Sequence, residues 1–433
     1  MKEKAIYLIG AGPMAMKTLN WAREENLKVI VTDINPNAPG LKYADKHKVL
    51  SASADQSEHY EFTKELKNEF DICGVYCGNE VGAYNANKLK QNLGLNYADN
   101  LAMKTVLDKS LMKESWLGKD IITPESKIID DVMHLKRIIK NEKGKFIIKP
   151  TLGSGSRGVR IINEGENLDN LWNEVFGSVD FKGKILIERF IEGRSIDANG
   201  IFIENNYYPA GILEKYISTP PECLPLGGND PVNISKKTIL EIHSLMEKAC
   251  RAINLTEGPV KGDLILSKEN KPFLLEVAPR FHGDVTTCNT LPFGTGCNPL
   301  KFLFKYFSSK QIDESLLNYS YENYAAWRVL CLPPGVEYQK LNRNVLETKN
   351  NITMVWFNPR HRKNIKKYND TQQIPGYICA FGKNKEEVEE KMSNYCESIT
   401  FPKSNILKNE WYFDLGRRLK ELNINPKSCA YLE

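Results

Sequence analysis

The sequence predicts an α/β protein that begins with a parallel, doubly wound sheet and continues into a mixed α+β region. Over the first hundred residues, short apolar runs alternate with helical stretches, as in parallel strands connected by helices. From Phe146 onward, apolar runs follow one another across turns, which favours antiparallel strands. The 433 residues are enough for about two to four domain-sized cores.

The first region contains three predicted strands, each followed by a helix. The strands are expected at residues 5–9, 28–32 and 72–77. The helices are expected from the turn after residue 12 to about 25, at 59–70 and at 82–93, with another at 111–116. Gly and Pro residues end the apolar runs, which is typical of tight turns.

The later regions are expected to be rich in strands. Strands are predicted at residues 146–149, 159–162, 185–188, 196–203, 260–266, 273–277, 325–330, 353–357 and 377–381. Helices are predicted at 236–253 and 385–399, the second with a solvated charged face. Between them, residues 216–233 read as a long Pro/Gly-rich loop, and loops of this length are usually functional.

Composition excludes several classes of protein. The 59 Lys+Arg against 54 Asp+Glu leave a net charge of +5, too mild to indicate a nucleic-acid partner. The ten cysteines form no C-x-x-C pair, so a zinc site is not expected. No apolar run approaches the roughly 20 residues of a membrane span, and the first apolar run is too short for a signal peptide. We expect a cytoplasmic enzyme.

One glycine-rich turn matches the dinucleotide fingerprint. The segment Gly10-Ala-Gly12-Pro-Met-Ala15 follows a predicted strand and opens a helix. Asp33 ends the next strand, about 20 residues further on. The same pattern also serves a βαβ unit that only needs a tight turn and close packing. An NAD-binding oxidoreductase therefore stays an alternative.

A second glycine-rich turn has more accompanying groups. Lys149 ends an apolar run and precedes Thr151-Leu-Gly-Ser-Gly-Ser-Arg-Gly-Val159. Small residues let the backbone fold over phosphates, and a lysine supplies them with a positive charge. The segment is not a Walker A loop, because its lysine precedes the glycines and no Gly-Lys-Ser/Thr follows.

Two carboxylates follow on neighbouring predicted strands. Asp263 and Glu276 lie on strands joined by a short turn, so both can face one point. Paired carboxylates of this kind suit Mg²⁺ that carries a nucleotide polyphosphate. Arg280 comes just after Glu276 and could hold a transferring phosphoryl group or an oxyanion.

The order Lys149, glycine-rich loop, Glu188, Asp263, Glu276 and Arg280 resembles the ATP-grasp superfamily, specifically its carboxylate–amine ligases. Segments 33–45, 108–109, 220–231 and 376–381 are also similar to that family. The resemblance implies an ATP-grasp fold with three parts. These are an N-terminal Rossmann-like pre-ATP-grasp domain (1–110), the ATP-grasp domain (111–310) and a C-terminal lid subdomain (311–433).

The resemblance also implies a role for each matching residue. Phosphate-binding groups would be Lys109, Lys149 and the loop Gly153, Ser154, Gly155, Ser156 and Gly158. Adenine would be bound by Glu188 and by the backbone of Phe190 and Ile191. Metal ligands would be Asp263 and Glu276, with Arg280 as the catalytic residue. His282, Gly283 and Asp284 would line the substrate site.

The implied activity is ATP-dependent amide-bond formation through an acyl phosphate, with ATP and Mg²⁺ (or Mn²⁺) as cofactors. The expected partners are a small carboxylate and a small amine, with no nucleic acid and no membrane, and a homodimer is left open. Two departures affect details, because Ala278 stands where many members have a metal-binding asparagine, and Ser195 where many have a ribose-binding glutamate. Asp197 is expected to replace that glutamate. A carboxylase or a carbamoyl-phosphate synthase-like enzyme stays an alternative.

Overall fold

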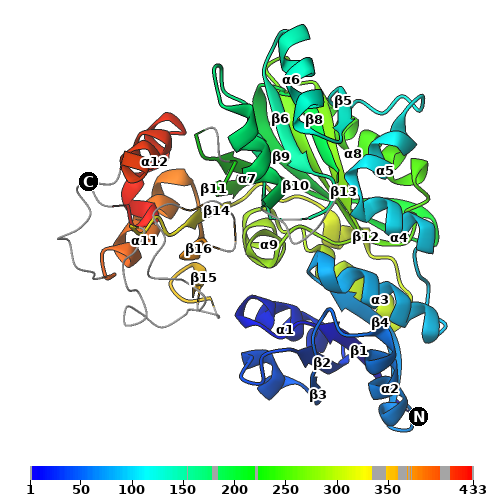
Figure 1. Ribbon diagram of the computed structural model, residues 1–433. Coiled ribbons are helices and arrows are strands. Elements are labelled where there is room, and N and C mark those ends of the chain that lie inside the picture. The colour runs from blue at the N-terminus through cyan, green and yellow to red at the C-terminus, as the bar shows by residue number, and fades with distance from the viewer. Residues whose placement is uncertain are drawn as a thin grey trace.

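The computed structural model describes residues 2–153, 155–177, 184–219, 223–333, 348–358, 368, 371, 373–399 and 410–431. Its elements form three sheets with helices packed against them (Figure 1). One sheet is parallel and two are antiparallel, so the predicted α/β class is confirmed.

The N-terminal unit is a parallel sheet with helices on both faces. Its strands, in the spatial order β3-β2-β1-β4, are β1 (Glu3–Ile9), β2 (Lys28–Asp33), β3 (Lys46–Val49) and β4 (Phe70–Cys77). Its helices are α1 (Met16–Glu24), α2 (Gln56–Leu66) and α3 (Glu80–Asn92). Tyr7 and its alternate neighbours on β1 pack against α2 and α3, whereas Ile6 and Leu8 pack with α1 and with α10 (Pro299–Ser309). Burial on both faces explains the continuous apolar run of this strand.

The large sheet has eight strands and crosses from the centre of the chain into its C-terminal part. In spatial order it contains β13 (Pro272–Ala278), β12 (Gly258–Ser267), β9 (Gly193–Ile203), β10 (Asn206–Ile217), β11 (Pro225–Asp230), β14 (Tyr324–Val329), β16 (Gly376–Gly382) and β15 (Ile352–Phe357). Helices α4 (Asn100–Leu107), α5 (Lys109–Trp116) and α8 (Lys236–Ala252) pack on the β9–β12–β13 end. This packing positions the side chains discussed below.

A small antiparallel sheet carries the second glycine-rich loop. Its strands, in the order β5-β8-β6-β7, are β5 (Ser126–Ile129), β6 (Phe146–Pro150), β7 (Arg160–Ile161) and β8 (Ile185–Arg189). Helices α6 (Val132–Asn141) and α7 (Leu168–Gly177) cover its apolar face. The predicted hairpin around the loop is confirmed, because β6 and β7 pair antiparallel.

The C-terminal part completes the large sheet and packs helices on it. These helices are α9 (Leu291–Thr295), α10 (Pro299–Ser309), α11 (Lys385–Cys396) and α12 (Glu410–Glu421). Because β11 pairs with β14, the division predicted at residue 311 does not coincide with a break in the sheet. The domain limits themselves stay a prediction.

The predicted loop at residues 216–233 is wrong for much of its length. β10 runs to Ile217, and Pro225–Asp230 is the buried strand β11. Glycine is needed there by close packing, since a Cβ on Gly228 would lie 2.0 Å from the Glu214 carbonyl oxygen. A Gly-rich segment can therefore be a strand in which backbones approach closely. Residues 220–222 lie outside the described ranges.

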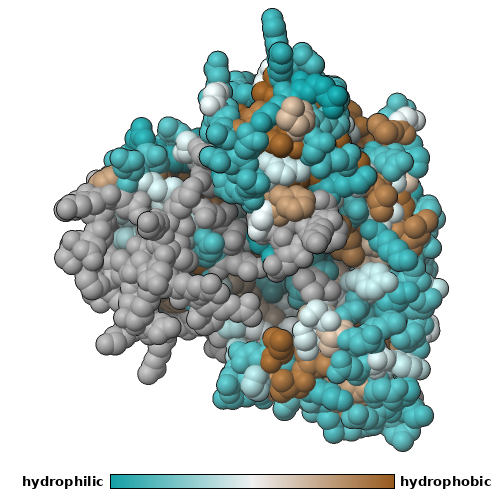
Figure 2. Space-filling model, viewed as in Figure 1, coloured by the Kyte–Doolittle hydropathy of each residue, from teal (hydrophilic) through white to brown (hydrophobic). Residues whose placement is uncertain are grey.

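Hydrophilic side chains cover most of the coloured part of the face in Figure 2, with hydrophobic residues in small patches. Over the described ranges, no helix combines the length and the apolar character needed to cross a bilayer.

Candidate functional site

The loop after β6 has the backbone conformation that its glycines predict. Gly153, Gly155 and Gly158 have φ angles of 119°, 71° and 69°, and Ser156 also has a positive φ of 60°. Side chains with a Cβ rarely adopt this region, so the glycines allow the chain to turn sharply here. Ser154 lies outside the described residues.

Lys109 connects this loop to one of the predicted metal ligands. Its ammonium group donates to the Gly153 carbonyl at 2.9 Å and lies 3.3 Å from Glu276 Oε2. Its backbone amide donates to the Thr151 carbonyl, which holds the N-terminus of α5 against the loop. Asp108 caps that helix by accepting from Ser110 N. Lys109 is thus the first residue of α5, and a helix N-terminus is a common place for an anion to bind.

Glu188, at the end of β8, is 2% exposed and lies between two lysines. Lys149 Nζ is 2.6 Å from Oε2, and Lys113 Nζ is 2.8 Å from Oε1. Burial alone would raise the pKa of Glu188, but the two lysines outweigh it and lower the pKa to about 2. Burial lowers the pKa of Lys113 to about 8, and the like charge of Lys149 adds to this. Beyond its ion pair with Lys113, Oε1 receives no directed hydrogen bond within the described chain.

The backbone after Glu188 is partly exposed at Phe190 and Ile191. The Phe190 amide donates to the Lys145 carbonyl at 2.9 Å, so it is engaged within the protein. An adenine ring at this position would therefore have to form hydrogen bonds with the other backbone groups of the segment.

Three carboxylates form a row across adjacent strands of the large sheet. Asp263 on β12 is directly opposite Glu276 on β13 and Asp197 on β9. Directly paired residues project on the same face of a sheet, so the three side chains are neighbours. The expectation that Asp263 and Glu276 face one point agrees with this register.

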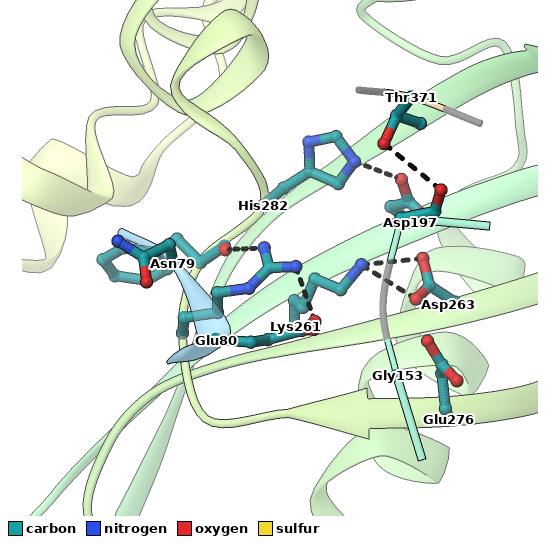
Figure 3. A network of polar contacts seen from close by, with 12 residues as sticks. Asn79, Glu80, Gly153, Asp197, Lys261, Asp263, Glu276, His282 and Thr371 are labelled. Atoms are coloured by element: carbon teal, nitrogen blue, oxygen red, sulfur yellow. Dashed lines mark hydrogen bonds and ion pairs between the residues drawn. The ribbon is translucent and has the colours of Figure 1, made fainter. Parts of the chain in front are cut away.

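Two lysines and a histidine neutralise this row. Lys261 lies 2.8 Å from Asp263, and Lys215 bridges Asp263 at 3.2 Å and Asp197 at 2.9 Å. His282 Nε2 lies 2.6 Å from Asp197 (Figure 3). Burial would raise the pKa of Asp263, but Lys261 and Lys215 outweigh it and hold the pKa well below its usual range.

Asp197 is 1% exposed, and Lys215 and His282 engage its carboxylate. The resemblance to the ATP-grasp superfamily predicts Asp197 near a ribose. Its contacts instead make it the partner of Lys215 and of the His282 imidazole, beside Asp263. The ribose role stays a prediction, and no contact of Asp197 favours it.

Arg280, two residues after β13, connects this part of the chain to the N-terminal unit. Its Nη2 donates to Glu80 Oε1 at 2.6 Å, and Glu80 is the first residue of α3. Its Nη1 donates to the Phe281 carbonyl, whereas its buried Nε has no partner in the described part of the chain. Burial would raise the pKa of Glu80, but Arg280 and then Lys261 outweigh it and lower the pKa.

No group of three or more His, Cys, Asp or Glu side chains within the described ranges could hold a metal ion alone. Asp263 and Glu276 supply two neighbouring carboxylates, and Glu276 has Lys109 as its ion-pair partner. Such a pair fits a hard cation whose other ligands come from phosphates and water.

In the first glycine-rich turn, the protein's own groups occupy the backbone amide and carbonyl of Ala11. The Ala11 amide donates to Asp33 Oδ2 at 2.8 Å, and the Gly40 amide donates to the Ala11 carbonyl. Ala11 is fully buried. An amide that would approach a pyrophosphate is thus already occupied, which disfavours the NAD-binding alternative.

Sequence reasoning missed Lys113, Lys215, Lys261 and Glu80. Lys113 is one helical turn from Lys109, and Lys261 is two positions before Asp263 on a strand. Both spacings place the two side chains on the same face of their element, so the sequence could have indicated both lysines. Lys215 lies on β10, a strand that was not predicted. Glu80 follows the end of β4, where ligand-binding groups of open α/β sheets gather.

Comparison with known proteins agrees with this arrangement. A family model described as an ATP-grasp domain matches residues 108–284. The alanine–anticapsin ligase of Bacillus subtilis (strain 168) is 23% identical over 243 residues, which is 49% of this chain and 49% of that protein. The chain spans about half the length of the curated relatives it matches.

Two solved structures resemble the whole chain. An L-amino acid ligase from Bacillus licheniformis has a TM-score of 0.72 at 18% identity, covering 94% of this chain and 100% of that one. The biotin carboxylase domain of the Hydrogenobacter thermophilus 2-oxoglutarate carboxylase, solved with MgADP and bicarbonate, has a TM-score of 0.71 at 18% identity and covers 100% of both chains. At such identities the likeness establishes the fold.

Proposed function

Residues 108–284 form an ATP-grasp domain, and from this premise we propose that the protein is an ATP-dependent carboxylate–amine ligase. It would activate a small carboxylate as an acyl phosphate and join it to an amine, giving an amide, ADP and phosphate. The observation that carries the proposal is the contact of Lys109 with both the Gly153 carbonyl and Glu276. That contact joins a glycine-rich phosphate loop to a pair of carboxylates in one site.

The nucleotide would bind between the small sheet and the row of carboxylates. Lys109 and Lys149 would contact its phosphates, and residues 153–158 would fold over them. Glu188 Oε1, whose contact in the described chain is the ion pair with Lys113 at 2.8 Å, would accept from the amino group of adenine with its remaining lone pair. The backbone of Phe190 and Ile191 would border the ring.

Asp263 and Glu276 would hold Mg²⁺. When bound, Mg²⁺ neutralises the phosphate oxygens and orients the transferred group. Both Asp263 oxygens contact lysines, so Glu276 is the more available ligand. Lys215 and Lys261 would compensate the charge of Asp263 and Asp197 before a metal nucleotide arrives. Mn²⁺ is a second cation to be tested.

The reaction would proceed in two steps. A carboxylate oxygen attacks the γ-phosphorus, the bond to the bridging oxygen breaks, and ADP leaves. The nitrogen of a neutral amine then attacks the carbonyl carbon, phosphate leaves, and the nitrogen loses a proton. Arg280, with its unpartnered Nε, would stabilise the charge on the acyl phosphate and the tetrahedral intermediate. His282, Gly283 and Asp284 would border the substrate.

The test is an ADP-release screen of paired amino acids and other small carboxylates and amines, with products identified by mass spectrometry. We expect ADP release that needs a carboxylate and an amide product that needs both substrates. ADP release that requires bicarbonate instead would favour the carboxylase alternative. Sedimentation of the purified protein tests the homodimer, and labelling in intact cells tests the cytoplasmic location.

A further inference from the structure

Two rows of side chains cross strands β9, β12 and β13 next to each other, and only one of them is acidic. The acidic row is the set described above, Asp197, Asp263 and Glu276. Two positions earlier on β12, Lys261 lies directly opposite Asn199 on β9 and Ala278 on β13, and these three form the lysine row. Residues two apart on a strand project on the same face, so the lysine row borders the acidic row.

The neighbours of Lys261 in its row offer little to a metal ion. Ala278 has no polar atom in its side chain. Asn199 is fully buried, and its Oδ1 accepts a hydrogen bond from the His282 amide at 2.8 Å. The Asn199 Nδ2, which is a donor, has no partner among the described residues. A divalent cation such as Mg²⁺ needs oxygen ligands, so the lysine row presents a positive charge where a second ion would need acceptors.

The acidic row already has its charge balanced by the protein. Its three carboxylates are paired with three ammonium groups, those of Lys109, Lys215 and Lys261. The Lys261 ammonium contacts both carboxylate oxygens of Asp263, Oδ1 at 2.9 Å and Oδ2 at 2.8 Å (Figure 3). No surplus negative charge therefore remains in the row to attract a second divalent cation.

Lys261 is able to act on a phosphate from this position. An ammonium group carries three donors, and contacts with the two Asp263 oxygens leave one for a phosphate oxygen. The side chain is 8% exposed and is held by a strand of the large sheet, so its charge is fixed and weakly screened. Glu276 is 26% exposed and has a single lysine contact, at 3.3 Å, which leaves it available to one metal ion.

We propose that the nucleotide site binds one divalent cation per ATP, held by Glu276 with Asp263, and that the Lys261 ammonium takes the place of a second cation by contacting the polyphosphate. Sites for phosphoryl transfer use either one metal ion or two, and a fixed ammonium supplies part of the charge of the second. The inference rests on the proposed ligase function and adds the number of metal ions and the residue that makes a second ion unnecessary.

The experiment counts metal ions in the wild-type protein. Mn²⁺ replaces Mg²⁺, and a non-hydrolysable ATP analogue with an imido group between the β- and γ-phosphorus replaces ATP. Electron paramagnetic resonance measures free Mn²⁺, and calorimetry measures the bound analogue. We expect one Mn²⁺ per bound analogue. This count needs no substitution, so it decides the matter even if a variant of Lys261 does not fold.

Lys261→Met removes the ammonium and keeps an apolar side chain of similar length. At one equivalent of Mn²⁺ its affinity for the analogue should fall about 10- to 100-fold, as for a lost charge-assisted contact. Excess Mn²⁺ should restore the affinity to within about threefold, because Asp263 can then share a second ion. Lys237→Met is the matched control: this lysine of α8 has a side chain that is 86% exposed, and its loss should change neither the affinity nor the Mn²⁺ count.

Two Mn²⁺ per analogue in a wild type that still ligates would refute the inference and leave the ligase function standing. An unchanged affinity in folded Lys261→Met would also overturn it. So would a loss of affinity that excess Mn²⁺ does not restore, since Lys261 would then only balance the charge of Asp263. Absence of analogue binding at every Mn²⁺ concentration would refute the nucleotide site on which the proposed function depends, and the inference with it.

Discussion

Two glycine-rich turns follow buried strands in this protein, and they differ in what contacts them. In the turn at Gly10–Ala15, the Ala11 amide is bound by Asp33 of the same unit. In the loop that begins at Gly153, the Gly153 carbonyl is contacted by Lys109, a cationic side chain that also contacts Glu276. The first turn is held by a carboxylate of its own unit, and the second is contacted by a lysine. Glycine spacing alone therefore does not distinguish the two turns, and the charge of the neighbouring side chains is the reason for proposing a phosphate site at the second one.

The largest effect is expected at the carboxylate that contacts Lys109. Glu276→Gln removes the more available metal ligand and should lower the ligation rate on the order of 10³-fold or more. The fold should persist, because Glu276 is partly exposed. Steady-state rates and circular dichroism of wild type and variant check this. Near-normal activity in a folded variant would contradict the metal assignment.

Glu188→Gln should destabilise the protein by about 3–5 kcal/mol, because it leaves Lys113 and Lys149 buried without a counter-charge. Lys113→Met is the control and should cost less, since Glu188 keeps Lys149.

The same carboxylate gives a pH dependence. The folded-state pKa of Glu188, about 2, lies below its ordinary value of 4.5. Its contribution to the free energy of unfolding is therefore fully present above pH 4.5 and is lost as the pH falls toward 2. Urea unfolding between pH 3 and 6 should therefore show a shallower acid slope in Glu188→Gln. Equal slopes in the two proteins would contradict the buried ion pair.

Asp33→Ala tests the closed turn. It should cost about 1–3 kcal/mol of stability by leaving the buried Ala11 amide unpaired, with ATP affinity unchanged. Calorimetry of the wild type with ATP and with NAD completes the comparison, and we expect binding of Mg-ATP alone. Tight NAD binding, or loss of ATP binding in Asp33→Ala, would reverse the roles of the two turns.

The smallest effects come from matched glycine substitutions. Gly12 has a φ of −63° and no neighbour within 4 Å of a Cβ, so Gly12→Ala should change stability by less than about 0.5 kcal/mol. Gly155 has a φ of +71°, and a Cβ there would lie 2.7 Å from Thr371 Oγ1. Gly155→Ala should cost about 1–2 kcal/mol and weaken ATP binding. Thermal unfolding measures the stability of the two variants, and calorimetry measures their ATP affinity. Equal losses of stability in Gly12→Ala and Gly155→Ala would contradict the different backbone requirements of the two turns.

The alternation of apolar runs and turns along the sequence was enough to predict strands whose partner is the next strand in the chain. Asp263 and Glu276 could be paired from sequence, because one turn joins their strands and fixes the register. The family match confirms the resemblance drawn from the ordered residues. Lys215 could not be found in this way, since its strand β10 was not predicted and its second partner, Asp263, comes from β12, which is distant in the chain. Strand β11 was not predicted, because its glycine content is typical of a loop. In the structure these glycines instead allow a close approach of neighbouring backbones.

The pairing of β11 with β14 has a practical consequence for dividing the chain. Gly227, Gly228, Asn229 and Asp230 bond directly to the segment Ala325–Arg328. A protein truncated at residue 310 would leave the β11 edge uncovered, with a row of free amides and carbonyls. Such an edge recruits strands from other molecules. The truncated protein should therefore aggregate on refolding, and adding the missing segment as a separate polypeptide should restore solubility.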